Sequence, residues 1–199
     1  MPHDLEIPDY VVERIIAKRG KLHVFEHFDP TNTALVVIDM QNFFVSEVAT
    51  AISICPNINR LANVIRTKGG VVAWVQLTVA EEMGGASLWP IYHDYFFTDA
   101  KRTAHKNGLT LGSKGHAIFP DLEVMEEDII SIKTRFSTFI QGSSDLHDKL
   151  QERGIENLLI AGTATNFCCE TSARDAMMIG YRVVMVSDAN AARYDEDHL

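Results

Sequence analysis

The chain has 199 residues, 46% of them hydrophobic, and a formal net charge of −9 at pH 7, so one core is expected and residues 1–199 are predicted to form a single domain. Charged residues are dispersed without a basic stripe, which argues against a nucleic-acid partner. The apolar runs are far shorter than a membrane span and the start of the chain lacks a signal-peptide pattern, so we expect a cytoplasmic protein with no membrane partner.

In chain order, residues 1–32 combine a short helical pattern over 10–18 with an aromatic segment, and we expect them to form an N-terminal arm. Residues 33–39 (TALVVID) are almost wholly apolar and end in a carboxylate, which is typical of a strand buried on both faces of a parallel sheet. A helical pattern over 57–68 ends at two glycines before a second such strand at 71–77.

Three more apolar runs predict strands at 128–133, 157–161 and 182–187, and helices are predicted at 144–153 and 168–179. Short buried strands that alternate with helices indicate an α/β fold, a three-layer α-β-α sandwich around a mostly parallel sheet. In such sheets, functional sites form at the carboxyl ends of the strands.

The segment 79–127 is too long for a simple connection and is rich in aromatic residues, among them Tyr92 and Tyr95. We expect it to fold over the edge of the sheet, either as a lid on the substrate or as a subunit contact. Exposed aromatic surface favours a homo-oligomer, whose order the sequence does not determine.

The three cysteines are odd in number and two are adjacent, so we expect reduced thiols rather than a disulfide framework. Cys168 directly follows a small-residue loop, whereas Cys169 begins the buried face of the next helix and is assigned to the core. Cys55 precedes Pro56 at an expected helix start and is interpreted as structural.

Three reactive side chains lie near the carboxyl ends of predicted strands: Asp39, Lys133 and Cys168. Taken singly, they could be a helix cap, a surface charge and a small buried apolar residue. Taken together they form a nucleophilic site, because the N-terminus of a helix and Lys133 both favour a thiolate at Cys168. Asp39 could take the thiol proton and return it to a leaving amine.

Three segments then match a known family in order: residues 34–44 (ALVVIDMQNFF), 133–139 (KTRFSTF) and 162–176 (GTATNFCCETSARDA). On these segments the chain resembles the isochorismatase-like cysteine hydrolases, which include nicotinamidase, N-carbamoylsarcosine amidase, ureidoacrylate amidohydrolase and biuret hydrolase. The matching segments cover residue 33 to about residue 190.

The resemblance implies an Asp39–Lys133–Cys168 catalytic triad and a cis peptide between Thr163 and Ala164. It also implies that the backbone amides of Ala164 and Cys168 form the oxyanion hole. Some nicotinamidases carry an Asp-x-His-x-x-His metal site near the second strand, where this chain has WVQLT, so we expect no metal and no cofactor.

We therefore predict a cysteine hydrolase that cleaves a C–N bond in a small amide, ureido or carbamoyl substrate. The GTATNFC segment is most like that of ureidoacrylate amidohydrolases. The alternatives are a nicotinamidase-like amide hydrolase and a non-catalytic binding or assembly protein; isochorismatases proper lack the cysteine. Asn42, Gln76, Tyr92 and Tyr95 are the predicted substrate contacts. The chain stops where relatives usually continue with a helix and a strand, which leaves its completeness open.

Overall fold

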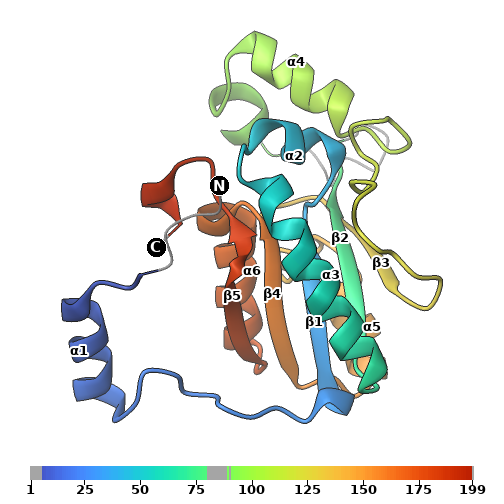
Figure 1. The fold of residues 1–199 in the computed structure, drawn as a ribbon. Coiled ribbons are helices and arrows are strands. Elements are labelled where there is room, and N and C mark those ends of the chain that lie inside the picture. Colours follow the sequence, from blue (N-terminus) through green and yellow to red (C-terminus); the bar gives the residue numbers. More distant parts are fainter. Residues whose placement is uncertain (1–5, 80–88, 90, 199) are drawn as a thin grey trace.

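The computed structural model describes residues 6–79, 89 and 91–198. Its five strands form one sheet in the order β3-β2-β1-β4-β5, and every pair of neighbours is parallel (Figure 1). The strands are β1 (Thr33–Ile38), β2 (Val71–Leu77), β3 (Ile129–Lys133), β4 (Asn157–Thr163) and β5 (Arg182–Ala191). The predicted α/β class is confirmed.

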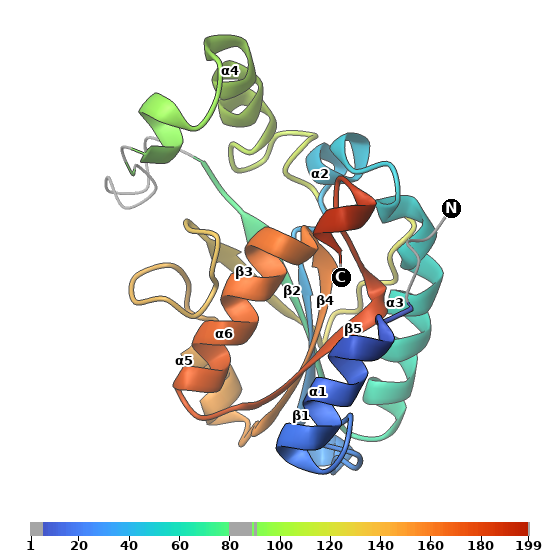
Figure 2. The same ribbon diagram turned by 90° about the vertical axis from the view of Figure 1, so that its left-hand side faces the viewer.

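Helices cover both faces of this sheet, as Figure 2 shows. Side chains of β1 alternate between two buried clusters: Ala34, Val36 and Ile38 belong to the cluster that includes residues of α5 (Leu146–Glu152) and α6 (Glu170–Met178). Leu35 and Val37 belong to the cluster built with α3 (Ala51–Thr67) on the opposite face. Burial on both faces explains why β1 is apolar at every position from Ala34 to Ile38 rather than at alternate ones.

The predicted N-terminal arm consists of α1 (Asp9–Arg19) and an irregular segment that leads to β1 (Figure 1). No residue of α1 is buried. Of the segment 79–127, residues 80–88 and 90 lie outside the described part of the chain. Its described part contains α4 (Asp99–Gly108), which lies with α2 (Asn42–Glu47) beyond the carboxyl ends of the strands (Figure 1).

Two helix starts differ from those expected. Pro56 lies inside α3, which begins at Ala51, because a proline on the exposed side gives up one backbone donor while Ile54, Cys55 and Ile58 gain burial around it. Helix α6 is preceded by a helical turn, Thr165–Cys169, and Cys168 lies within this turn, ahead of α6 itself.

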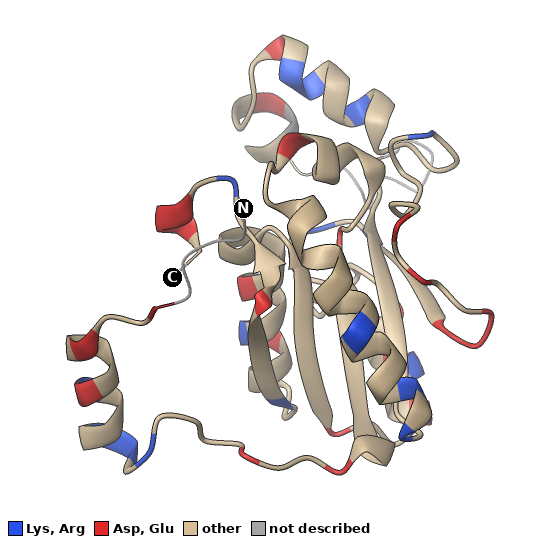
Figure 3. Cartoon of the chain, in the orientation of Figure 1, with Lys and Arg blue, Asp and Glu red and all other residues tan. Residues whose placement is uncertain are grey.

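Most charged residues lie on the helices and loops, and the central strands β1 and β4 carry none, whereas β3 carries Lys133 and β5 carries Arg182 and Asp188 (Figure 3). Within the described ranges, no helix combines the length and the apolar character that crossing a membrane requires.

Candidate active site

Asp39 follows β1 directly and is anchored from the strands on both sides. Its backbone N–H donates to the carbonyl of Val75 (2.9 Å), its carbonyl accepts from Thr163 Oγ1 (3.0 Å), and its Oδ1 accepts from the N–H of Leu77 (3.0 Å). Asp39 has a φ of 51°, the left-handed region that aspartate tolerates better than most residues. This turn directs a buried carboxylate to the carboxyl ends of the strands.

Lys133 ends β3, two strands away from β1 in the sheet. Neighbouring strands are roughly 4.8 Å apart, so only a long side chain can bridge β3 to the end of β1. The Lys133 ammonium does so, with Nζ 2.8 Å from Asp39 Oδ2, 3.3 Å from Cys168 Sγ and 3.0 Å from the carbonyl of Arg135. The contact with Asp39 is an ion pair, whereas the carbonyl of Arg135 and the Cys168 sulfur accept hydrogen bonds from the ammonium.

Cys168 lies between the end of β4 and the start of α6. The strand passes so close to β1 that a Cβ on Gly162 would overlap the backbone of Ile38, and Gly162 has a φ of +115°. The peptide between Thr163 and Ala164 is cis, as the resemblance implied. The following turn brings the buried Cys168 thiol beside Lys133 and Asp39.

The charges of this buried cluster determine which group can move a proton. Burial raises the pKa of Asp39, and the positive charge of Lys133 offsets that rise only in part. Burial alone would lower the pKa of Lys133, but its interactions with Asp39 and Cys168 outweigh burial and leave this pKa raised. Lys133 therefore stays an ammonium, while Asp39 is a stronger base than an exposed carboxylate.

The expectation of a lowered thiol pKa is wrong for this site. Burial raises the pKa of Cys168, and the charge of Asp39 raises it further, while Lys133 lowers it as expected. The resting sulfur thus keeps its proton. Because the thiol also interacts with the Asp39 carboxyl, that carboxylate is the base within reach as the sulfur attacks.

A cavity of about 440 Å³ opens above the cluster and is lined by Asp39, Thr163, Ala164 and Cys168 at its inner end. Most of its wall is aromatic, formed by Phe43, Phe44, Tyr92, Phe96, Phe97, Phe136 and Phe167. Such a cavity suits a small, flat or apolar ligand that reacts at one end.

The predicted substrate contacts are not all brought to this cavity. Tyr92 lines it, whereas Asn42, Gln76 and Tyr95 are absent from its lining. Asn42 donates to the carbonyl of Lys114 (2.8 Å), Gln76 donates to the carbonyl of His116 (2.8 Å), and Tyr95 is 79% exposed.

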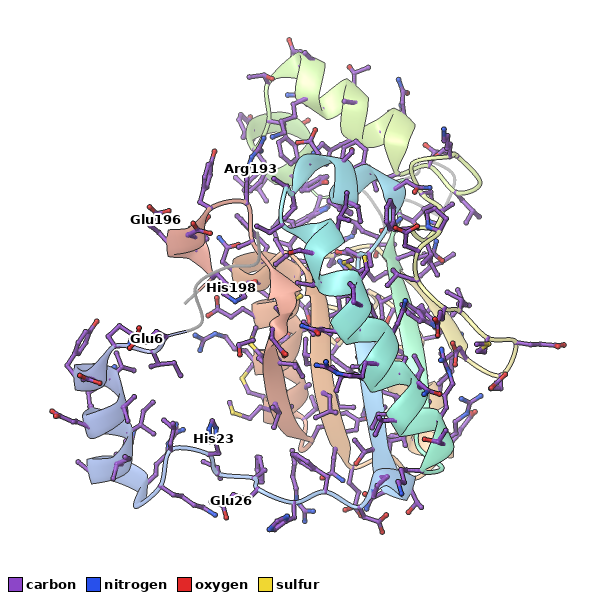
Figure 4. All side chains as sticks on the ribbon, viewed as in Figure 1. Glu6, His23, Glu26, Arg193, Glu196 and His198 are labelled. Atoms are coloured by element: carbon purple, nitrogen blue, oxygen red, sulfur yellow. The ribbon has the colours of Figure 1, made fainter. Side chains whose placement is uncertain are left out.

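Sequence reasoning missed two groups of lining residues. His105, on α4, is buried in the aromatic wall. Besides Asp39, the lining contains the charged residues Glu47, Lys101 and Arg193: the Glu47 carboxylate lies 3.8 Å from Lys101 Nζ and 3.6 Å from Arg193 Nη2. Figure 4 labels Arg193 beside α2 and below α4. Only contacts between distant segments reveal these residues, since none belongs to the three matching segments.

The described residues contain no group of three His, Cys, Asp or Glu side chains arranged to hold a metal ion. Trp74, in the WVQLT segment, is buried and donates its Nε1–H to Asp128 Oδ2 (2.7 Å).

Comparisons with known proteins agree with this architecture. The profile of the Isochorismatase domain matches residues 33–199. A protein of Arabidopsis thaliana named "Probable inactive nicotinamidase" is 36% identical over 175 residues, which cover 84% of each chain. A ureidoacrylate amidohydrolase of Rhizobium rhizogenes is 34% identical over 179 residues, covering 80% of this chain and 70% of the relative. The crystal structure of a cysteine hydrolase from Pseudomonas syringae superimposes with a TM-score of 0.72 at 26% identity, covering 83% of this chain and 75% of that one.

Proposed function

The chain belongs to the isochorismatase domain family, and on that premise we propose that it is a cysteine amidohydrolase that cleaves a C–N bond in a small amide, ureido or carbamoyl compound. One observation carries this proposal: Lys133 Nζ lies 2.8 Å from Asp39 Oδ2 and 3.3 Å from Cys168 Sγ at the inner end of a cavity. A nucleophile, a base and a fixed positive charge are thereby within contact of one another.

In the first step, Cys168 Sγ attacks the substrate carbonyl carbon while its proton passes to Asp39. The backbone amides of Ala164 and Cys168 are proposed to hold the oxyanion, since both residues line the cavity beside the sulfur. Collapse of this intermediate breaks the C–N bond, and the departing nitrogen takes the proton from Asp39. The products are an acyl or carbamoyl thioester on Cys168 and ammonia or an amine.

In the second step, Asp39 removes a proton from water as the water attacks the thioester carbon, and the same proton then returns to the sulfur. Lys133 stays positive throughout and stabilises the carboxylate and the developing thiolate. The raised pKa of Asp39 suits a group that both accepts and donates a proton near neutral pH.

The likeness to ureidoacrylate amidohydrolases over 80% of the chain favours a ureido or carbamoyl substrate. The aromatic wall of the cavity favours a second candidate, a flat aromatic amide such as nicotinamide. Because one relative is named a probable inactive nicotinamidase, a non-catalytic role is the third candidate.

The test is ammonia release from phenylurea, N-carbamoylglycine, nicotinamide and benzamide by the wild type, Cys168→Ala and Cys169→Ala. We expect release by the wild type and by Cys169→Ala, whose side chain belongs to the core, and a loss of at least about a thousandfold in Cys168→Ala. Equal activity of Cys168→Ala and the wild type would refute the mechanism. Release from nicotinamide alone would select the second candidate, and no release from any compound would select the third.

A further inference from the structure

Gln41, which follows Asp39 closely in the chain, is a buried side chain that the proposed mechanism does not use. It is 0% exposed and is absent from the lining of the cavity, whereas Asp39 and Leu77 are both part of that lining. Its backbone forms a bridge with Ile118, while its side chain reaches the end of β2. Any effect of Gln41 on the chemistry must therefore pass through its neighbours.

The side-chain amide of Gln41 is held in one orientation. Its Nε2 donates to the carbonyls of Leu77 (3.1 Å) and His116 (2.9 Å), and its Oε1 accepts from the N–H of Leu77 (2.8 Å). An amide nitrogen has two N–H bonds and both are used, whereas a half-turn of the amide would place this nitrogen against the Leu77 N–H. The network thus fixes Gln41 Oε1 on the Leu77 N–H.

The same N–H of Leu77 also donates to Asp39 Oδ1 (3.0 Å). One hydrogen is shared between the Asp39 carboxylate and the Gln41 amide oxygen, and the amide oxygen is the closer of the two acceptors. A shared hydrogen stabilises a carboxylate less than a hydrogen that is donated to it alone. The partial negative charge of Gln41 Oε1 also opposes negative charge on its neighbour. Both effects make Asp39 a stronger base.

The other oxygen of Asp39 receives no compensating hydrogen bond within the part of the chain that the structure describes. Oδ2 is buried without a hydrogen-bond partner, and it lies 2.8 Å from Lys133 Nζ in the ion pair. Donated hydrogen bonds stabilise the charged form of a carboxylate, and two or three of them can lower its pKa below about 2. Asp39 has few such bonds, and Oδ2 is the oxygen that can take up the thiol proton.

We propose that Gln41 is a positioning residue that keeps Asp39 basic by competing with it for the N–H of Leu77. This inference rests on the proposed function, in which Asp39 accepts the Cys168 proton and later returns it. A carboxylate that received this hydrogen bond alone would hold its negative charge more firmly and would accept the proton less readily. Gln41 acts on the reaction only through the Leu77 peptide.

The test is the titration of the Asp39 carboxyl group in the wild type and in Gln41→Met, followed by the NMR chemical shift of its carboxyl carbon. Methionine is similar in size to glutamine and offers no oxygen to the Leu77 N–H. We expect the midpoint of Gln41→Met to lie roughly 0.5 to 1 pH unit below that of the wild type, because Asp39 then receives the whole hydrogen bond. The acid limb of the kcat/KM profile should shift by the same amount.

The other titratable groups that face Asp39 are unchanged in this variant. They are Lys133 from β3, Cys168 and Cys169 from the turn before α6, and Tyr92 from the helical turn Ile91–Tyr95. The side chain of Gln41 hydrogen bonds to backbone groups of the described residues, so its replacement removes no charge from this set.

Gln76→Met is the matched control for the loss of a buried amide. Gln76 is also buried, and its Nε2 donates to the same His116 carbonyl (2.8 Å), whereas the Leu77 N–H is shared by Asp39 and Gln41. Gln76→Met should lower the Tm, as Gln41→Met does, but it should leave the Asp39 midpoint at its wild-type value. If Gln41→Met does not fold, Gln41→Asn replaces it, because the shorter amide does not reach the Leu77 N–H; the midpoint should again fall.

The inference is overturned if the Asp39 midpoint of the Gln41 variant equals or exceeds that of the wild type, or if Gln76→Met lowers the midpoint equally. A kcat/KM that falls by the same factor at every pH, with an unchanged midpoint, would show a purely structural role and would also overturn it. The NMR titration needs no turnover. If the wild type hydrolyses no compound, the proposed function fails, while the midpoints still decide whether Gln41 sets the basicity of Asp39.

Discussion

The Asp39–Lys133 ion pair is so deeply buried that removing its positive member should destabilise the whole fold. The two side chains are 1% and 0% exposed, and their charged atoms lie 2.8 Å apart. At an effective dielectric constant of about 20, that separation corresponds to roughly 6 kcal/mol of attraction. Measured losses for breaking one side of a buried pair are about 3–5 kcal/mol, because the remaining charge stays in the interior.

Lys133→Met keeps much of the side-chain length and removes the charge, so we expect a loss of about 3–5 kcal/mol in the free energy of unfolding. For a chain of this size that is a fall of about 10 °C in Tm. Adding Asp39→Asn should recover most of the loss, since asparagine tolerates the left-handed backbone at this position and can still accept from the N–H of Leu77.

The pH dependence of the unfolding free energy provides an independent test of this reasoning. Without Lys133, burial should raise the pKa of Asp39 further above its value in the unfolded chain. A carboxyl whose pKa is raised by folding favours the folded state below its unfolded pKa, and that contribution is lost as the pH rises through the folded pKa. The deficit of Lys133→Met relative to the wild type should therefore be larger at pH 7 than at pH 5.

Urea and thermal unfolding followed by circular dichroism would measure these differences. The matched control is Lys149→Met: Lys149 also makes an ion pair, 2.7 Å from Asp145, but its side chain is 38% exposed and its loss should cost less than about 1 kcal/mol. A Lys133→Met variant as stable as the wild type, or a double variant no more stable than the single one, would refute the reasoning.

Two further predictions concern contacts that hold the strands of the sheet in place. Asp128→Asn should lower the free energy of unfolding by about 2–3 kcal/mol, because the buried carboxylate accepts from Arg66 Nε (2.9 Å) and Nη2 (2.6 Å). Burial would raise the pKa of Asp128, but its hydrogen bond to Arg66 and its other partners leave this pKa lowered. The difference in unfolding free energy between Asp128→Asn and the wild type should therefore become smaller as the pH falls through that lowered pKa. A difference that does not depend on pH would contradict this prediction. Gly162→Ala should abolish soluble expression, since the added Cβ would overlap the backbone of Ile38. In the control Gly142→Ala, at a φ of +76° with open space around it, the free energy of unfolding should fall by only about 1 kcal/mol. Equal expression of both variants would argue against the close approach of β4 to β1.

Much of this protein can be derived from local sequence. The five strands were predicted from short apolar runs, a pattern that needs no tertiary information. For β1, β2 and β4 the physical reason is burial on both faces, which favours an apolar residue at nearly every position. Asp39, Lys133 and Cys168 could be singled out because strand ends in a parallel sheet meet at one edge, and the structure brings them into contact.

What the sequence could not decide depends on contacts between distant segments. The protonation state of Cys168 was misjudged because it depends on how completely the fold buries the thiol, which outweighs the helix terminus and Lys133. The substrate contacts were chosen by residue type, and three of the four lie outside the cavity lining because their partners come from other segments. His105 reaches the cavity wall only because the fold places α4 beside Tyr92, and a lone histidine on a helix does not reveal such a contact.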